Sequence, residues 1–224
     1  MEERRIDMKA WLIAAAAALA FAALALWAPM DGTAPIDDSI RGSWSLTAEE
    51  QPAAAMEALN KLGSTAVFAG ATLLAAALSW AFGRRRQAVV VIGTVLAALL
   101  LNSGLKEWLQ RPRPEHAGWI EASGYSFPSG NAMVGMALYG LLAVIAWRGA
   151  RSGWLRLAAA AAAVLVIGAV GYCRLYFGVH YATDIAAGYA AGLFCAAAGA
   201  ALLGPGGSRS SALRRRGSHP TFPG

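Results

Sequence analysis

The chain has 224 residues, of which 57% are hydrophobic and 14% are charged, and its mean hydropathy is +0.46. Soluble domains carry about 25% charged residues, so this composition excludes an ordinary soluble protein and indicates a membrane protein. The net charge of +6 does not indicate nucleic acid as a partner, because the cations follow the membrane spans. Cys173 and Cys195 are too few for a disulfide framework, and we expect both to pack between helices.

Six apolar stretches are long enough, or nearly long enough, to cross a bilayer. They cover residues 10–30, 64–82, 87–105, 131–147, 154–172 and 183–203. The first follows basic residues, as a signal peptide does, but its apolar run of about 20 residues exceeds a typical signal core. We therefore expect an all-α, polytopic protein whose six transmembrane helices form one domain over 1–203. Residues 204–224 are rich in Gly, Ser, Pro and Arg, which predicts a disordered basic tail.

The basic residues predict the orientation of the spans. If the N-terminus lies inside, 13 of the 19 Lys and Arg residues lie on the inner side. Such an excess is typical of cytoplasmic segments, so both termini are expected in the cytoplasm. The polar clusters of the motif region, 106–184, then all fall on the outer face.

The first outer loop, 31–63, is acidic and is expected to contain a short helix. Ile36, Ile40 and Trp44 are spaced by four residues, which favours a helix lying on the bilayer surface; a loop packed over the bundle is the alternative. Residues 47–50 fit a capping box, although Pro52 could equally be the first helical residue.

Three cations lie on the outer side, where the orientation rule does not require them: Lys106, Arg113 and Arg174. Lys106 or Arg111 alone would indicate a membrane anchor, but polar groups at span ends that face a bundle interior are functional candidates. Three converging cations need an anion, and arginine binds two phosphate oxygens at once. The carboxylates that compete for these cations locally are Glu107, Glu115 and Glu121.

Two further clusters suit phosphate chemistry. Pro128-Ser129-Gly130 precedes the fourth span, and a small-residue turn before a helix presents backbone N–H groups to an anion. His180 and Asp184 are four residues apart on one helix face, so the carboxylate can orient the imidazole for attack. Alone, the turn is a weak signal, and the His–Asp pair could simply cap the last span.

The polar clusters have these spacings: Lys106, six residues and Arg113-Pro114; Pro128-Ser129-Gly130; Arg174, five residues, His180, three residues and Asp184. Together they closely resemble the three signature motifs of the type 2 phosphatidic acid phosphatase superfamily, and the run 173–180 resembles its bacterial membrane members. The resemblance implies a six-helix lipid phosphatase of the bacterial plasma (inner) membrane that uses no metal and no cofactor. It implies that the phosphoryl group is held by Lys106, Arg113, Ser129, Gly130 and Arg174. It also implies His180 as the nucleophile, through a phosphohistidine intermediate, and Asp184 as its partner.

Two positions depart from the family pattern. Cys173 replaces a serine, which is a mild change. Asn131 stands where the family has the histidine that protonates the leaving group, and an amide cannot transfer a proton at neutral pH. Loss of a general acid costs about 10²- to 10⁴-fold. Either the chain is a weakened enzyme, or it has lost catalysis by nature or by a substitution made to trap a ligand, or another acid such as His116 serves.

The leading hypothesis is hydrolysis of a phosphate monoester or diphosphate on a membrane lipid, with the tail between spans and the headgroup in the basic pocket. By resemblance, the candidate substrates are undecaprenyl diphosphate, phosphatidylglycerol phosphate and phosphatidic acid. The rival is a lipid-phosphate-binding protein or inactive regulator that kept the cations and lost turnover. A transporter is less favoured, because it would need polar or broken helices near the midplane, and nothing argues for vanadate chemistry. The oligomeric state stays open.

Overall fold

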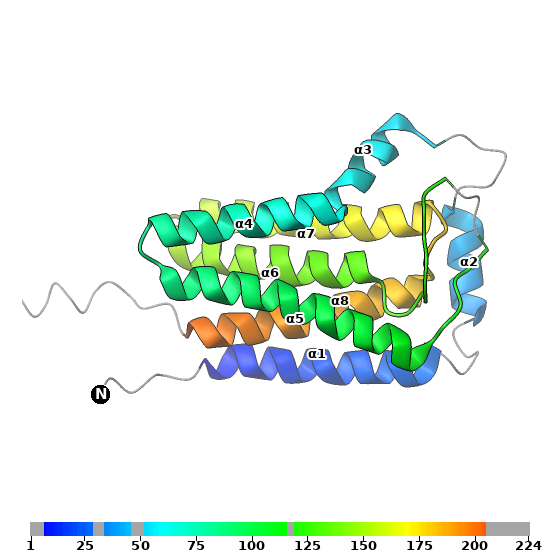
Figure 1. Cartoon of the computed structure of the whole chain (residues 1–224), viewed down its shortest axis with the longest axis horizontal. Helices are drawn as coiled ribbons and strands as arrows, with labels where there is room; N and C mark the ends of the chain where they lie inside the picture. Colours follow the sequence, from blue (N-terminus) through cyan, green and yellow to red (C-terminus); the bar gives the residue numbers. More distant parts are fainter. Residues whose placement is uncertain (1–6, 29–33, 46–51, 116–118, 205–224) are drawn as a thin grey trace, which may run out of the picture.

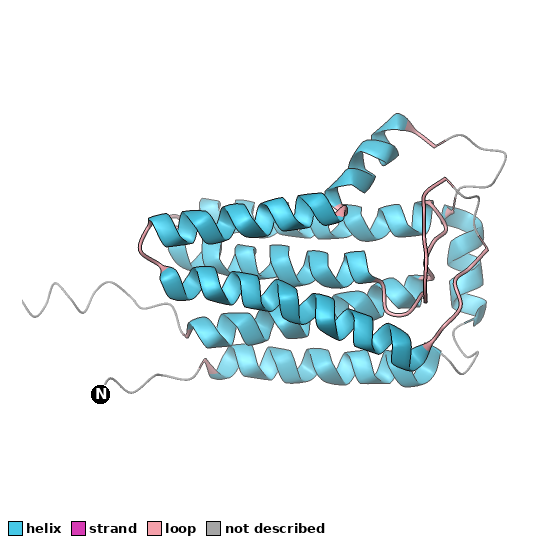
Figure 2. Ribbon diagram, in the orientation of Figure 1, coloured by secondary structure: helices cyan, strands magenta, loops and turns pink. Residues whose placement is uncertain are grey.

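Eight helices make up the part of the chain that the computed structural model describes, residues 7–28, 34–45, 52–115 and 119–204, and these residues contain no strand. Figures 1 and 2 show most of them as one elongated bundle. The helices are α1 Met8–Trp27, α2 Ala34–Trp44, α3 Ala54–Leu62, α4 Thr65–Ala81, α5 Arg85–Leu109, α6 Gly130–Gly149, α7 Gly153–Tyr176 and α8 Ala182–Leu203. The tail 205–224 and His116 lie outside the described residues.

The expected six-span, all-α architecture is confirmed. Five helices, α1, α5, α6, α7 and α8, are each long and apolar enough to cross a membrane. The expected span 64–82 corresponds to α4, which passes the same test when it is taken together with α3; these two helices form a bent pair, with an angle of 46° at the break between them. The bounds of the other five spans differ from the predicted ones by a few residues, mainly because polar residues such as Lys106 continue a helix past the end of its apolar run.

The first loop contains two helices instead of one. The helix expected around residues 36–44 is α2, which lies across one end of the bundle (Figure 1). The second, α3, begins at Ala54 with Ala53 as its N-cap, so the prediction of Pro52 as the first helical residue is wrong. The alternative capping box at 47–50 lies outside the described residues.

Helix α8 is the most buried span, and glycines bring it against α6. A Cβ atom on Gly192 would lie 2.4 Å from the carbonyl oxygen of Met133, and one on Gly188 would lie 2.6 Å from that of Ser129. Small residues four apart let two helix backbones approach closely in a membrane. The start of α6 is therefore held directly against the first turns of α8.

Alternating helix directions collect the polar motifs at one end of the bundle. Helices α1, α5 and α7 finish at the end where α4, α6 and α8 begin (Figure 1). We call this the motif end, and α2 lies across it. Cys173 and Cys195 are both buried and free, as expected.

Candidate active site

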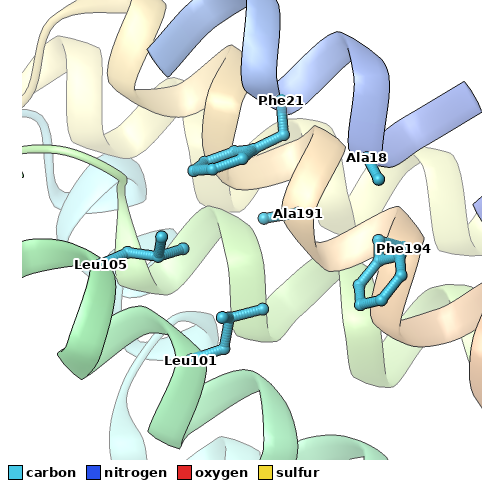
Figure 3. Close-up of a pocket in the computed structure, with 6 residues that line it drawn as sticks. All are labelled: Ala18, Phe21, Leu101, Leu105, Ala191 and Phe194. Atoms are coloured by element: carbon cyan, nitrogen blue, oxygen red, sulfur yellow. The ribbon is translucent and has the colours of Figure 1, made fainter. Parts of the chain in front are cut away.

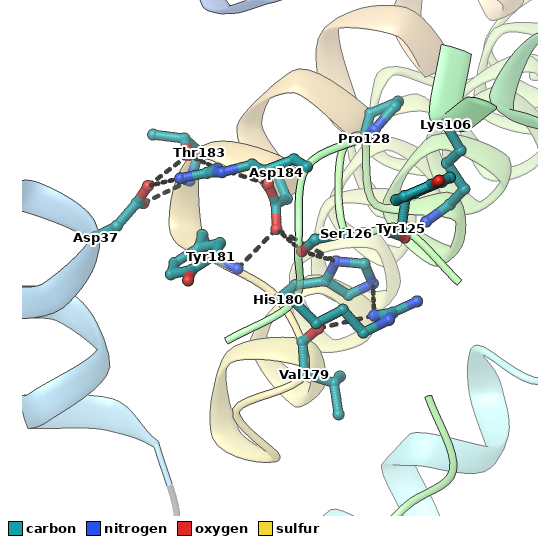
Figure 4. A network of polar contacts seen from close by, with 12 residues as sticks. Asp37, Lys106, Tyr125, Ser126, Pro128, Val179, His180, Tyr181, Thr183 and Asp184 are labelled. Atoms are coloured by element: carbon teal, nitrogen blue, oxygen red, sulfur yellow. Dashed lines mark hydrogen bonds and ion pairs between the residues drawn. The ribbon is translucent and has the colours of Figure 1, made fainter. Parts of the chain in front are cut away.

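The motif end brings the predicted site residues onto four neighbouring segments. Lys106 lies in the last turn of α5, Gly130 begins α6 after the N-cap Ser129, and Arg174 lies in the last turn of α7. Arg113 follows α5 in a loop, and the His180–Asp184 pair bridges the start of α8. Figure 4 shows the polar contacts that join several of these residues.

His180 and Asp184 form a buried pair. Nδ1 of His180 lies 3.4 Å from Oδ2 of Asp184, and the two side chains are 5% and 0% exposed. Nε2 of His180 lies 3.3 Å from Nη1 of Arg113. A guanidinium group can only donate, so Nε2 is the acceptor and the ring proton belongs on Nδ1, facing the carboxylate. The lone pair of Nε2 thus points toward Arg113.

Backbone carbonyl groups hold two of the cations. Arg113 donates to the carbonyl oxygens of Val179 at 2.8 Å, Ser123 at 2.9 Å and Gly124 at 3.1 Å. Lys106 donates to the carbonyl oxygen of Tyr125. Carbonyl groups fix the position of a cation without neutralising it, so both keep their charge for an anion.

Arg174 and Ser129 each carry a buried atom without a partner among the described residues. These atoms are Nε of Arg174 and Oγ of Ser129, on residues that are 9% and 0% exposed. An unsatisfied buried donor costs about 1–3 kcal/mol, and a bound phosphoryl oxygen would satisfy both. Arg174, Lys106 and Arg113 form no ion pair within the described ranges, so the competing glutamates do not neutralise them there.

Asn102 on α5 supports the turn before α6. Its Nδ2 donates to the carbonyl oxygen of Pro128 at 3.2 Å, and the residue is 7% exposed. A Cβ atom on Gly130 would lie 2.9 Å from Oδ1 of Asn102. Gly130 is thus required by close packing as well as by any approach of phosphate to the backbone. On the other side of the turn, the N–H of Ser129 donates to the carbonyl oxygen of Asp184 at 3.0 Å.

Asn131 contacts the bent pair formed by α3 and α4. Its Nδ2 donates to the carbonyl oxygen of Gly63 at 2.7 Å, at the break between α3 and α4. No hydrogen bond joins Asn131 to His180 in the described structure. The Asn131 side chain is therefore engaged in a contact with the backbone between α3 and α4.

The sequence did not reveal the second contact of Asp184. Arg111, which the sequence would indicate as an anchor, donates to Oδ1 of Asp184 at 2.7 Å and to Oδ2 of Asp37 at 2.8 Å. Ser126 Oγ donates to Oδ2 of Asp184. The available signal was weak: Arg111 stands two residues before Arg113, and Asp37 is one of several acids in the first loop.

Burial keeps His180 neutral. Removal from water lowers the pKa of His180 from its ordinary value of 6.5 to about 4. The hydrogen bond and charge of Asp184 raise this pKa, while the charges of Arg113 and Lys106 lower it. At neutral pH the imidazole is therefore unprotonated.

An apolar cavity of about 170 Å³ opens between α1, α5 and α8 (Figure 3). It is lined by Ala18, Phe21, Leu101, Leu105, Ala191 and Phe194. Leu105 directly precedes Lys106. At a rise of about 1.5 Å per residue, Leu105 lies about 6 Å and Ala191 about 14 Å from the motif ends of their helices. The cavity thus lies between the helices, below the motif end.

Comparisons with known proteins agree on the superfamily of this chain. Residues 87–204 match the model of the PAP2 superfamily. The chain is 36% identical over 99 residues to phosphatidylglycerophosphatase B of Bacillus subtilis (strain 168); the match covers 42% of this chain and 47% of that protein, about half of its length. The fold is similar, with a TM-score of 0.72 and 25% identity, to the crystal structure of a transmembrane PAP2-type phosphatidylglycerolphosphate phosphatase from Bacillus subtilis. That similarity covers 81% of this chain and 91% of the other.

Proposed function

The chain belongs to the PAP2 superfamily, and on that basis we propose that it is a membrane phosphatase that removes a phosphate group from a lipid. One observation carries the proposal. Lys106, Arg113 and Arg174, which form no ion pair within the described ranges, lie at the same end of the bundle as a buried, neutral histidine, and Nε2 of that histidine faces Arg113. Such an arrangement suits a nucleophile that attacks a bound phosphoryl group.

The chemistry divides into two displacements. Nε2 of His180 attacks phosphorus, the P–N bond forms, and the P–O bond to the lipid breaks. Asp184 stabilises the positive charge that develops on the ring, as a carboxylate partner of histidine does. Water then attacks the phosphorus of the phosphohistidine and loses a proton to solvent. The P–N bond breaks, inorganic phosphate leaves, and Nε2 regains its lone pair. The cations balance the charge on the phosphoryl oxygens in both steps.

Asn131 bears on which leaving group is accepted. An alkoxide needs a proton as it departs, and the amide of Asn131 cannot supply one. A phosphate released from a diphosphate needs less help, because it is a far weaker base. We therefore expect turnover of diphosphates to survive Asn131 better than turnover of monoesters. His116, the other candidate acid, stays a prediction because it lies outside the described residues.

The lipid is proposed from the similar proteins and from the cavity. Both Bacillus subtilis matches carry names that refer to phosphatidylglycerophosphate, a monoester, which favours this lipid over phosphatidic acid. Undecaprenyl diphosphate is favoured by the leaving-group argument. The apolar cavity beside Lys106 would take part of a lipid tail. The excess of Lys and Arg at the other end of the spans supports a site on the outer face of a bacterial plasma membrane, with both termini inside.

The deciding experiment measures phosphate release by the purified chain in detergent from phosphatidylglycerophosphate and from undecaprenyl diphosphate. We expect His180→Ala to lower the rate at least about 10⁴-fold, as loss of a covalent nucleophile does. We expect Asn131→His to raise the monoester rate by about 10²- to 10⁴-fold and the diphosphate rate by less. An equal gain on both lipids would contradict the leaving-group argument.

A second function, lipid-phosphate binding without turnover, is favoured by the contact between Asn131 and Gly63. It predicts that the native chain binds both lipids, that His180→Ala changes no rate, and that Asn131→His creates activity. Binding measured with lipid-loaded nanodiscs, alongside the rates, separates the two functions.

A further inference from the structure

We propose that Arg111, held by Asp37 of α2, is a positioning residue that fixes the Asp184 carboxylate and, through it, the imidazole of His180. We call the three residues Asp37, Arg111 and Asp184 the α2 latch. The effect on turnover rests on the proposed function, but the effect on the imidazole does not. The latch makes the docking of α2 a condition for an ordered nucleophile.

Arg111 is held on every side. Nη1 lies 2.7 Å from Oδ1 of Asp184 and 2.8 Å from Oγ1 of Thr183, and Nη2 lies 2.8 Å from Oδ2 of Asp37. The guanidinium carbon lies 4.1 Å from the centre of the Tyr181 ring, and the side chain is only 11% exposed. A planar guanidinium that is stacked and bonded at both ends has little freedom to turn.

The two oxygens of Asp184 therefore have separate tasks. Oδ1 receives Arg111, whereas Oδ2 receives the N–H of Tyr181 at 2.8 Å, the hydroxyl of Ser126, and the Nδ1 side of His180. With Oδ1 fixed, the carboxylate cannot rotate away, so Oδ2 keeps facing Nδ1. This orientation in turn leaves Nε2 on the side of Arg113.

Asp37 supplies the second carboxylate to Arg111 from 74 residues away in sequence. It is 1% exposed; Oδ1 accepts the N–H of Thr183 at 3.0 Å and Oδ2 accepts the Thr183 hydroxyl at 2.7 Å. The purely structural alternative is that Asp37 caps α8 and nothing more. The proposal differs from this alternative in its electrostatics. Asp37 neutralises part of the charge of Arg111, so Asp184 keeps a net negative field toward His180.

The charges around His180 come from every neighbouring segment. Asp184 faces it from α8, Arg113 from the loop after α5, and Lys106 from α5, while Arg174 ends α7. Asp37 and Arg111 act from behind Asp184. Although burial opposes its charge, the carboxylates of Asp184 and Asp37 raise the pKa of Arg111 above its ordinary value, so the latch cation stays charged at all working pH values.

Two substitutions in the latch are expected to act differently on His180. Arg111→Gln leaves Asp184 without its counter-charge, so the stronger negative field raises the pKa of His180 above about 4. Asp37→Asn gives Arg111 entirely to Asp184, so the pKa of His180 does not rise. Loosened packing would instead admit water and raise the pKa in both variants.

The measurement is an NMR titration of isotope-labelled histidine in the full chain in detergent. The chain has three histidines, and the His180 signal is assigned by its loss in His180→Gln. Ser45→Ala is the matched control, because Ser45 also docks α2, through the carbonyl oxygen of Leu175 at 2.8 Å, without touching the latch. A rise in Arg111→Gln alone supports the proposal; equal rises in all three variants, or none in any, would overturn it.

Turnover gives the second readout. We expect Arg111→Gln to lower kcat by about 10- to 100-fold, as loss of an outer-shell partner does, with KM little changed. Arg111→Lys keeps the charge but not the fork, so it should keep the His180 titration near that of the native chain while lowering kcat. If the native chain releases no phosphate, the proposed function fails while the titration still tests the latch.

Discussion

Two arginines in the last turns of their helices show how the two ends of the bundle differ. Arg148, in the last turn of α6, has an ion pair with Asp7 at 2.6 Å and donates to the carbonyl oxygens of Ala200 and Gly204 at 3.1 and 2.9 Å. Arg174, in the last turn of α7, has no ion pair and a buried Nε without a partner in the described structure. Arg148 therefore stabilises the fold, whereas Arg174 has a donor whose hydrogen bond an anion could accept.

The same contrast recurs within the motif end. Arg111 pairs with two carboxylates, whereas Arg113, two residues later, contacts carbonyl groups and His180. Sequence position and residue type do not distinguish the role of Arg111 from that of Arg113. The number of carboxylates around each cation distinguishes them.

The largest difference between the ends should appear when both arginines are replaced by glutamine. We expect Arg174→Gln to raise the KM for a lipid phosphate by about 10- to 100-fold, since hydrogen bonds to a charged group are worth about 1.5–3 kcal/mol, with a near-native melting temperature. Arg148→Gln should lower the melting temperature in detergent and leave KM unchanged. Kinetics and thermal unfolding of both variants check this, and a reversal of the two effects would remove the contrast.

A smaller effect should follow from crowding the contact of α6 with α8. We expect Gly188→Ala to destabilise the fold by about 1–3 kcal/mol, because overpacking forces the backbones apart and the new Cβ meets the Ser129 carbonyl oxygen at 2.6 Å. Gly168→Ala in α7 is the control, since nothing lies within 4 Å of its added Cβ. Helix propensity favours alanine over glycine by about 1 kcal/mol in both helices, so an equal gain of stability in both variants would show that propensity, and not contact, decides.

The last effect concerns the dependence of stability on pH. The pKa of His180 is about 4 in the folded chain and 6.5 in its ordinary state, so the unfolded chain takes up the proton first as pH falls. Stability is therefore lost from about pH 6.5 down to 4, while the neutral nucleophile persists until pH approaches 4. Melting temperatures of the native chain and His180→Gln across this range check the sign, because the variant should lose less stability on acidification.

Hydropathy was enough to predict the spans, because each apolar run must cross about 30 Å of hydrocarbon. The break at Gly63 was not predicted, since α3 contains Glu57 and Lys61 and is too polar to be read as part of a span. It depends on tertiary contacts such as that of Asn131 with the Gly63 carbonyl oxygen, which no local pattern records.

The cations and the His–Asp pair were found because their spacings are fixed within short segments. Asp37, Asn102 and Ser126 were missed because each acts across long sequence separations, such as the 74 residues between Asp37 and Arg111. A lone acid in an acidic loop has no periodicity to distinguish it. Only the packing of α2 over the motif end identifies which acid is used.

The apolar cavity has a consequence for how such a chain could change its lipid. Its walls come from α5 and α8 on one side and from Ala18 and Phe21 of α1 on the other, and α1 lies outside the region 87–204 that matches the family model. The groups that we propose to react all lie within that region. Substitution of the α1 residues that line the cavity should therefore change which lipid tail fits, while the proposed reacting groups stay unchanged.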